Sequence, residues 1–208
     1  MQEEIAGAGK YEWGSAAPSY SCAYLESPVL ELCEKLSAKR VLDLGCGNGA
    51  FTKALVERGF ETVGCDPDED GLVFARENAP NAKFIKLGVY DDPAGLGEKD
   101  FDVVVSTEVV EHLYSPSALP RFAAQVLAPG GHLIVSTPYH GYLKNVLISL
   151  AGKWDFHHHP LDDGGHIKFW SKDTLTALLK EQGFRVKEFM GAGRLPYIWK
   201  SMILLAQR

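Results

Sequence analysis

Residues 41–49 read Val-Leu-Asp-Leu-Gly-Cys-Gly-Asn-Gly: an apolar strand pattern that runs into a turn with three alternating glycines. A helical pattern follows from Ala50 to Arg58 and ends at Gly59. Glycines in such a turn let the main chain turn tightly and approach a ligand closely. The N-terminus of the next helix adds free N–H groups. The stretch therefore predicts a strand–turn–helix unit with a cofactor at the carboxyl end of its strand.

Outward from this unit, short apolar runs alternate with helical patterns. Strands are predicted at Arg40–Leu44, Glu61–Cys65, Ala82–Lys86, Phe101–Ser106, His132–Ser136, Phe184–Phe189 and Met202–Ala206. Further helices are predicted at Asp68–Asn78, Ser117–Leu127 and Lys172–Gln182, the last with Ser171 as its N-cap and Gly183 at its end. This alternation indicates an α/β domain, with a mostly parallel sheet and helices on both faces.

Two segments stand outside the alternation. Residues 1–38 precede the first strand and are predicted to form a helical N-terminal cap, so that the main domain covers residues 39–208. Residues 137–170 form a long insertion, and insertions of this length are often lids or binding loops. Because ligands of open α/β sheets bind beyond the carboxyl ends of the strands, both segments are expected to close over that edge.

Composition narrows the class of protein. The chain has 208 residues, 46% of them hydrophobic and 23% charged, which suits one globular domain. Its net charge of −6 disfavours nucleic acid as a partner. We find no signal peptide and no apolar run that would span a membrane. Four cysteines without a Cys-x-x-Cys pair indicate buried thiols in a reducing compartment, so we expect a cytoplasmic protein.

The glycine turn has two interpretations. Residues 45–50 satisfy the dinucleotide fingerprint G-x-G-x-x-[G/A], which would make the chain an NAD(P)-dependent oxidoreductase. Asp43, however, lies within the apolar strand just before the turn, where a carboxylate suits a cationic amino-acid head better than a pyrophosphate. Its alternative role is that of a buried Asp that holds the loop. Asp66 ends the second strand and can accept hydrogen bonds from ribose hydroxyls.

These residues together resemble class I S-adenosylmethionine-dependent methyltransferases. Residues 41–49 resemble the first motif of that family, Asp66 matches its ribose-binding acid, and residues 127–131, Leu-Ala-Pro-Gly-Gly, match its LxPGG turn. The resemblance covers about residues 39–136. It implies a Rossmann-like, seven-stranded sheet ordered 3-2-1-4-5-7-6 with an antiparallel last strand.

The resemblance also implies a cofactor site. The methionine portion would lie among Asp43, Gly45 and Gly47, and the adenine would lie between Val89 and Tyr90. The expected set of cofactor-binding residues is Asp43, Gly45, Cys46, Gly47, Asp66, Pro67, Val89, Tyr90, Thr107 and Glu108. Many family members have an Asp where this chain has Val89, so the adenine amino group would need Asp91 or the backbone.

The fourth predicted strand leads into Glu108, Glu111 and His112. In a helical turn these three would share one face. They would then form a divalent metal site, a base beside the transferring methyl, or a hydrogen-bonded cluster that holds the turn. The string resembles the ubiquinone-biosynthesis O-methyltransferase group, in which the corresponding residues have been linked to a divalent metal such as Mg²⁺. Residues 164–169, which include His166, resemble a Gly-x-His segment of that group.

This second resemblance implies a small-molecule acceptor, methylated on a hydroxyl oxygen of a phenol, a quinol or a sugar. A small-molecule N-methyltransferase is the alternative. The catalytic candidates are His112, His166 and Glu111, since a neutral His can remove a hydroxyl proton near pH 7. A metal on Glu108, Glu111 and His112 would instead lower the pKa of the acceptor.

Aromatic and histidine-rich segments are candidates for the acceptor pocket. One or two of His157, His158 and His159 are expected to line it with Trp154 and Phe156, rather than to bind zinc. Tyr11, Trp13 and Tyr20 either line the pocket or pack the cap onto the domain. The apolar segments 143–150 and 193–200 are expected to pack in the core, with peripheral membrane contact as the alternative.

Overall fold

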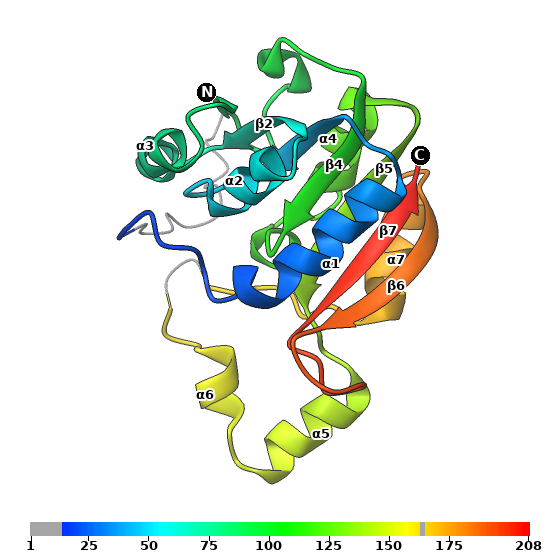
Figure 1. Ribbon diagram of the computed structural model, residues 1–208. Coiled ribbons are helices and arrows are strands. Elements are labelled where there is room, and N and C mark those ends of the chain that lie inside the picture. Colours follow the sequence, from blue (N-terminus) through cyan, green and yellow to red (C-terminus); the bar gives the residue numbers. More distant parts are fainter. Residues whose placement is uncertain (1–13, 163–164) are drawn as a thin grey trace, which may run out of the picture.

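The computed structural model describes residues 14–162 and 165–208. At its centre is one seven-stranded sheet in the order β3-β2-β1-β4-β5-β7-β6 (Figure 1). Strands β1 to β5 pair in parallel, and β7 runs antiparallel to both β5 and β6. The predicted fold class and strand order are confirmed.

The elements follow the predicted alternation closely. The strands are β1 Arg40–Leu44, β2 Glu61–Asp66, β3 Lys83–Lys86, β4 Phe101–Thr107, β5 Leu127–Pro138, β6 Arg185–Ala192 and β7 Ser201–Gln207. The helices are α1 Cys22–Lys35, α2 Ala50–Glu57, α3 Glu69–Asn78, α4 Ala118–Val126, α5 Tyr142–Leu150, α6 Trp154–His158 and α7 Lys172–Glu181, with short 3₁₀ turns η1 Pro93–Leu96 and η2 Val110–His112.

Strand β5 differs from its predicted bounds. It begins at Leu127, so the Pro-Gly-Gly stretch that was expected to be a turn lies within the strand. The pairing of β5 with β4 shifts between Phe101 and Val103. This irregularity accommodates a proline, which has no N–H to donate to the ladder, together with two glycines.

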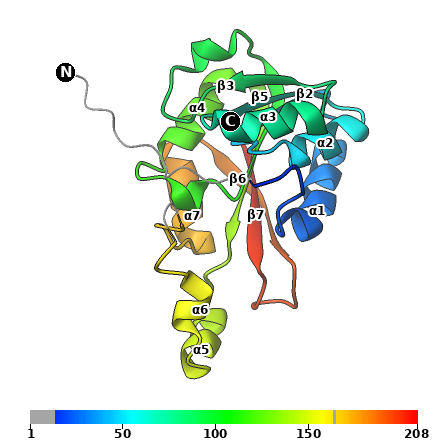
Figure 2. The same cartoon turned by 90° about the vertical axis from the view of Figure 1, so that its left-hand side faces the viewer.

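Helices cover both faces of the sheet (Figure 2): α1, α2 and α3 lie on one side, and α4 and α7 on the other. Successive strand residues face opposite sides, so Val103 and Val105 pack with α1 and α2, whereas Val104 packs with α4 and α7. All three valines have no exposed surface. The Val-Val-Val run thus marks a central strand buried on both faces, as expected.

The start of α7 follows the predicted capping pattern. The Ser171 hydroxyl accepts a hydrogen bond from the Thr174 N–H at 3.2 Å, and the Thr174 hydroxyl accepts one from the Ser171 N–H at 3.0 Å. This reciprocal pair satisfies two N–H groups that the first turn leaves unpaired. Gly183, with φ of +84°, ends the helix where predicted.

The predicted N-terminal cap is described only in part. Residues 14–21 lead into α1, whose Leu25, Val29 and Cys33 are buried against the sheet. Helix α1 therefore belongs to the helical layer of the domain. Tyr11 and Trp13 lie outside the described residues.

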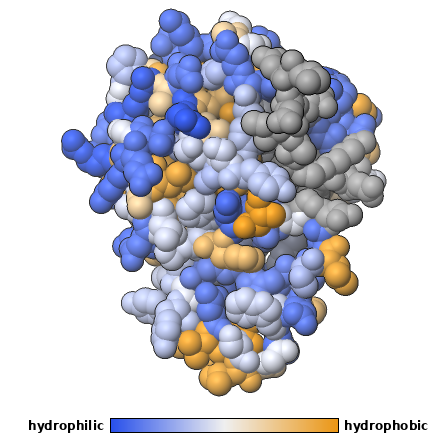
Figure 3. All heavy atoms as spheres, turned by 180° about the vertical axis from the view of Figure 1, so that it is seen from behind, coloured by the Kyte–Doolittle hydropathy of each residue, from blue (hydrophilic) through white to orange (hydrophobic). Residues whose placement is uncertain are grey.

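The insertion forms an arm of α5 and α6 that projects beyond the carboxyl edge of the sheet (Figure 1). Its outer surface is apolar: Tyr142 is 87% exposed and Leu150 is 80% exposed. In the loop between β6 and β7, Leu195 is 73% exposed. Core packing of these two segments was therefore a wrong expectation for their outward side chains. Figure 3 shows hydrophobic side chains gathered at the end of the molecule that this arm forms.

Two further predictions concern the membrane and the thiols. Within residues 14–162 and 165–208, none of the helices has the length and apolar character that crossing a bilayer requires. The four cysteines are all unpaired thiols, and Cys33, Cys46 and Cys65 are buried.

Candidate active site

A cleft of about 980 Å³ lies at the carboxyl ends of β1, β2 and β4. Its volume is at the upper end of the range for small-molecule and cofactor sites. Nine of the ten predicted cofactor-binding residues line it: Gly45, Cys46, Gly47, Asp66, Pro67, Val89, Tyr90, Thr107 and Glu108. The candidate catalytic residues His112 and His166 line it as well.

The glycine turn needs its glycines for two physical reasons. Gly45 and Gly49 have φ of +84° and +73°, values at which the backbone of a residue with a side chain is strained. A Cβ on Gly45 would lie 2.5 Å from Cγ2 of Val109, and a Cβ on Gly49 would lie 2.6 Å from Cα of Ala75. Because both contacts are far shorter than van der Waals distance, the turn can pack against its neighbours only without these side chains.

Asp66 fastens the glycine turn to the end of β2. Its Oδ2 accepts a hydrogen bond from the Gly47 N–H at 2.9 Å, and its Oδ1 accepts one from the Asp68 N–H at 2.9 Å. Burial raises the pKa of Asp66, while these backbone donors oppose the shift. Each carboxylate oxygen has a second lone pair, so the side chain can still accept hydroxyl hydrogen bonds from a ligand in the cleft.

Asp43 is the one predicted cofactor residue that does not line the cleft. It is fully buried, and its Oδ2 accepts a hydrogen bond from the Thr52 hydroxyl at 2.6 Å. Its Oδ1 has no hydrogen-bond partner among the described residues, and burial raises its pKa to about 7. The arrangement matches the alternative role, a buried Asp that holds local structure, although it ties α2 to β1 through a side chain.

The segment after β3, which lies beside Pro67, is held by its own side chains. Asp91 Oδ2 accepts a hydrogen bond from the Gly88 N–H at 2.7 Å. The Tyr90 hydroxyl accepts one from the Ser115 N–H at 3.1 Å. Val89, Tyr90 and Asp91 all line the cleft. Asp91 is therefore placed where it could contact an adenine amino group, the contact that an Asp at the position of Val89 would make in other family members.

The segment before α1 closes the cleft from another side. Asn48 Nδ2 donates to the carbonyls of Ser15 and Ala17 at 3.1 and 2.8 Å, and Asn78 Nδ2 donates to the carbonyl of Ala16 at 2.8 Å. Sequence reasoning missed three lining residues from this region, Ser19, Ser21 and Cys22. The amide side chain of Asn48, inside the glycine motif, was the available signal.

Glu108 stands apart from the two residues with which it was grouped. Its φ is +54°, and the helical turn that follows covers only Val110–His112. The carboxylate instead accepts hydrogen bonds from the hydroxyls of Ser136 and Ser201 at 2.8 and 2.9 Å. Burial raises the pKa of Glu108 to about 7. The predicted shared face of Glu108, Glu111 and His112 is therefore not formed, because the left-handed residue breaks the helix.

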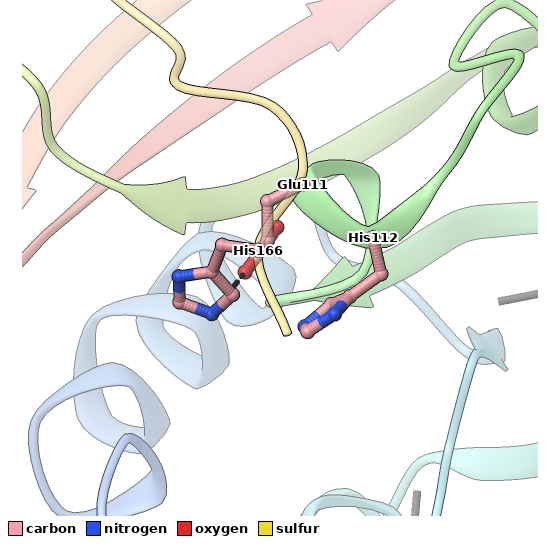
Figure 4. A group of neighbouring side chains, drawn as sticks. All are labelled: Glu111, His112 and His166. Carbon is pink, nitrogen blue, oxygen red and sulfur yellow. Dashed lines mark ion pairs between the residues drawn. The ribbon is translucent and has the colours of Figure 1, made fainter. Parts of the chain in front are cut away.

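His166 takes the place that was predicted for Glu108 (Figure 4). One ligand atom from each of Glu111, His112 and His166 lies within 4.8 Å of the others. The rings of His112 and His166 are 4.9 Å apart and nearly perpendicular. The backbone N–H groups of Ile167 and Lys168 both donate to the Glu111 carbonyl at 3.0 Å, which holds the segment after the insertion against this turn.

The electrostatics of this cluster are unusual. Glu111 has no exposed surface, and neither of its carboxylate oxygens has a hydrogen-bond partner in the described part of the chain. Burial, followed by the charge of Glu108, raises the pKa of Glu111 well above its usual range. Burial and the neighbouring His112 lower the pKa of His166 to about 4, so this imidazole is neutral near pH 7. A neutral imidazole is able to take a proton.

A second, smaller cavity of about 260 Å³ adjoins the cleft and shares four lining residues with it: Tyr20, Tyr24, Glu108 and His166. His157 and His158 line this cavity, as expected of an acceptor pocket. Trp154 and Phe156 do not line it and are 51% and 75% exposed. Within the described residues, the His157–His159 run contributes to no metal-binding cluster.

Comparisons with known proteins agree with this geometry. The methyltransferase domain family matches residues 20–188. A ubiquinone biosynthesis O-methyltransferase from Hydrogenovibrio crunogenus is 30% identical over 77% of this chain and 67% of its own length. Other relatives of the same name are covered over 54% to 68% of their length, so the chain spans about half to two thirds of these curated relatives.

Solved structures show the same fold. An S-adenosylmethionine-dependent methyltransferase from Mesorhizobium loti superposes with a TM-score of 0.67 at 19% identity, over 94% of this chain and 99% of its own. A magnesium protoporphyrin IX methyltransferase from Synechocystis, solved with bound S-adenosylhomocysteine, gives 0.64 at 22% identity, over 88% of this chain and 81% of its own. The fold of this chain is thus that of these two methyltransferases.

Proposed function

This chain belongs to the methyltransferase domain family, the S-adenosylmethionine-dependent methyltransferases, and we propose that it transfers the methyl group to a hydroxyl oxygen of a small-molecule acceptor. Family membership removes the rival interpretation of residues 45–50 as a nicotinamide site. The ubiquinone biosynthesis O-methyltransferases among its relatives support oxygen as the acceptor atom.

The observation that carries the proposal is the pairing of a neutral imidazole with a buried carboxylate at the cleft. His166 Nε2 lies 3.9 Å from Glu111 Oε1, and His166 lines both the cleft and the smaller cavity. A hydroxyl acceptor in the smaller cavity would meet this imidazole beside the transferring methyl. When Glu111 is ionised, its carboxylate stabilises the imidazolium that forms as His166 accepts the hydroxyl proton.

Methyl transfer from a sulfonium is a displacement in line with the C–S bond, so alignment of the acceptor supplies much of the rate. The acceptor oxygen forms the new C–O bond, its proton passes to His166, and the sulfonium leaves as a neutral thioether. His112, whose ring contacts that of His166, is the second candidate for the proton acceptor. In this proposal Asp66 and the glycine turn would hold the cofactor, which would supply the activated methyl group.

The same cluster has the donors of a metal site. The buried carboxylate of Glu111, which has no hydrogen-bond partner among the described residues, would hold a divalent ion together with the imidazoles of His112 and His166. Glu108 lies outside this set, because its oxygens already accept two hydroxyl hydrogen bonds. Two nitrogen donors suit a transition metal such as Zn²⁺, whereas Mg²⁺ prefers oxygen ligands. When bound, such an ion would lower the pKa of the acceptor hydroxyl.

The test is a methyl-transfer assay with labelled S-adenosylmethionine against catechols, quinols and sugars, and against amines of matched shape. We expect a methyl ether, identified by mass spectrometry of the product. Methylamine products from the amine set, with no ether formed, would overturn oxygen as the acceptor atom. His166→Gln is the matched variant, because it should retain binding of S-adenosylhomocysteine while ether formation falls.

A further inference from the structure

The smaller cavity carries a charge pattern that the transfer step does not need. It is lined by three basic side chains, Lys144 from α5, Arg194 from the loop before β7, and Lys200, the residue before β7. Among the described residues that line it, Glu108 is the only acidic one. This concentration of positive charge occurs in a chain whose net charge is −6.

Lys144 is the central member of the three. It is only 5% exposed, and its Nζ donates a single recorded hydrogen bond, to the carbonyl of Lys200 at 3.3 Å. An ammonium has three donors, so the cavity retains donor capacity at this point. Burial of a lysine is costly unless an anion is close, and here the charge of Glu108 partly opposes that cost.

The neighbouring groups strengthen the positive potential. Burial, followed by the charge of Arg194, lowers the pKa of Lys144 to about 8. Burial and the charge of Lys144 in turn lower the pKa of His140 to about 3 and that of His157 to about 4. The cations therefore repel one another across one small space and keep the imidazoles neutral. A bound anion would relieve that repulsion and accept hydrogen bonds from the N–H groups of these side chains.

Tyr20 and Tyr24 place Lys200 on the wall of the cavity. The Lys200 Nζ lies over both rings, 4.0 and 5.1 Å from their centroids, and donates to the Tyr20 hydroxyl. His158 Nε2 is buried and has no hydrogen-bond partner in the described segments. The cavity therefore offers donors from α5, α6 and β7, three elements that meet only in the folded chain.

We propose that the smaller cavity binds an anionic group of the methyl acceptor, a carboxylate or a phosphate, through Lys144, Arg194 and Lys200. The inference rests on the proposed function, because the two cavities meet at Glu108 and His166 and one acceptor would occupy both. The anion sits at the α5 end, and the hydroxyl to be methylated points to the cleft. At about 260 Å³ the cavity suits one such group with a short body.

The experiment uses the full chain saturated with S-adenosylhomocysteine and titrates it calorimetrically with 3,4-dihydroxybenzoate and with its neutral amide. We expect the acid to bind roughly tenfold to a hundredfold more tightly, the range of a charge-assisted hydrogen bond. Lys144→Met should reduce that preference by a similar factor. Lys153→Met, an exposed residue of the same arm that does not line the cavity, is the matched control and should leave the preference unchanged.

Inorganic phosphate, titrated in the same way, separates the two anions. Binding of phosphate without binding of the acid assigns the site to phosphoryl acceptors. Binding of the acid without binding of phosphate assigns it to carboxylates. If neither anion binds, or if the acid and the amide bind equally, the anionic subsite is wrong. These are binding measurements and do not depend on methyl transfer. A preference for the acid over the amide without methyl transfer would support the subsite and contradict the proposed function. Methyl transfer without that preference would support the proposed function and contradict the subsite.

Discussion

His166 Nε2 lies 3.9 Å from Glu111 Oε1, although His166 lies near the end of the long insertion and Glu111 follows β4. The contact exists because two N–H groups beside His166 donate to the Glu111 carbonyl. Among the described residues the Glu111 carboxylate has no hydrogen-bond partner, and burial keeps the neighbouring His166 imidazole neutral.

Replacing Glu111 with Gln should lower kcat by about a hundredfold or more, the usual contribution of a positioned acid–base group. The amide keeps the shape of the side chain but cannot stabilise an imidazolium. The measurement is steady-state methyl transfer, with calorimetric binding of S-adenosylhomocysteine as the check on folding. Glu181→Gln, at an exposed position at the end of α7, is the control. Wild-type turnover in Glu111→Gln would argue against a chemical role for the cluster.

Substitutions at Asp66 and at Asp43 should have different effects on affinity for the cofactor. Asp66→Ala removes a carboxylate from the cleft wall and frees the Gly47 N–H, so we expect affinity for S-adenosylhomocysteine to fall roughly tenfold to a hundredfold. Asp43→Asn, which lies behind the wall and can still accept from Thr52, should change affinity little. A larger loss in Asp43→Asn than in Asp66→Ala would show that the assignment is reversed.

Asp43 should also make the stability of the cofactor-free protein depend on pH. Its pKa is raised by burial from 3.8 to about 7, so the folded state holds this proton more tightly than the unfolded state does. The contribution to stability is fully present below pH 3.8 and is lost as the pH rises through about 7. The loss is on the order of 4 kcal/mol.

Asp43→Asn cannot ionise, so its free energy of unfolding should fall less between pH 4 and pH 8 than that of the wild type. Urea unfolding at several pH values measures the difference. Other acids with raised pKa, such as Glu108, are present in both proteins and cancel in the comparison. Parallel curves for the two proteins would mean that Asp43 ionises freely in the folded state.

The segment before α1 should slow release of the cofactor. Asn78 Nδ2 donates to the carbonyls of Ala16 and Asn48, at 2.8 and 2.9 Å. Asn78→Ala removes both bonds and should raise the dissociation rate of S-adenosylhomocysteine several-fold, as stopped-flow displacement would show. Asn81→Ala, at a nearby exposed position, is the control. Equal rates in all three proteins would exclude a closing role for this segment.

The Glu111, His112 and His166 cluster should distinguish between metal ions. Because two of its three donors are imidazole nitrogens, we expect Zn²⁺ to bind more tightly than Mg²⁺ in calorimetric titrations of the metal alone. His112→Gln should weaken Zn²⁺ binding. No heat from either ion, together with full activity in a chelator, would leave the cluster with its proton-transfer role only.

The sequence by itself determined the fold and the cofactor end of the site. The apolar runs set the strands, and the glycine turn with Asp66 set the cleft, because both depend on interactions within a few residues or within one strand–helix unit. Gly45 illustrates this, since its positive φ is set within the turn itself and strains any other residue.

Tertiary structure decided the acceptor end. The positive φ of Glu108 interrupts the helical turn that the spacing of Glu108, Glu111 and His112 predicted. The end of the insertion returns to the turn after β4 and places His166 beside Glu111. Lys144 and Lys200, which lie on different elements, met in one cavity only when α5 folded back toward β7. Such contacts join residues far apart in the chain, so they follow from how the elements pack and carry no local pattern that a reading of the sequence would detect.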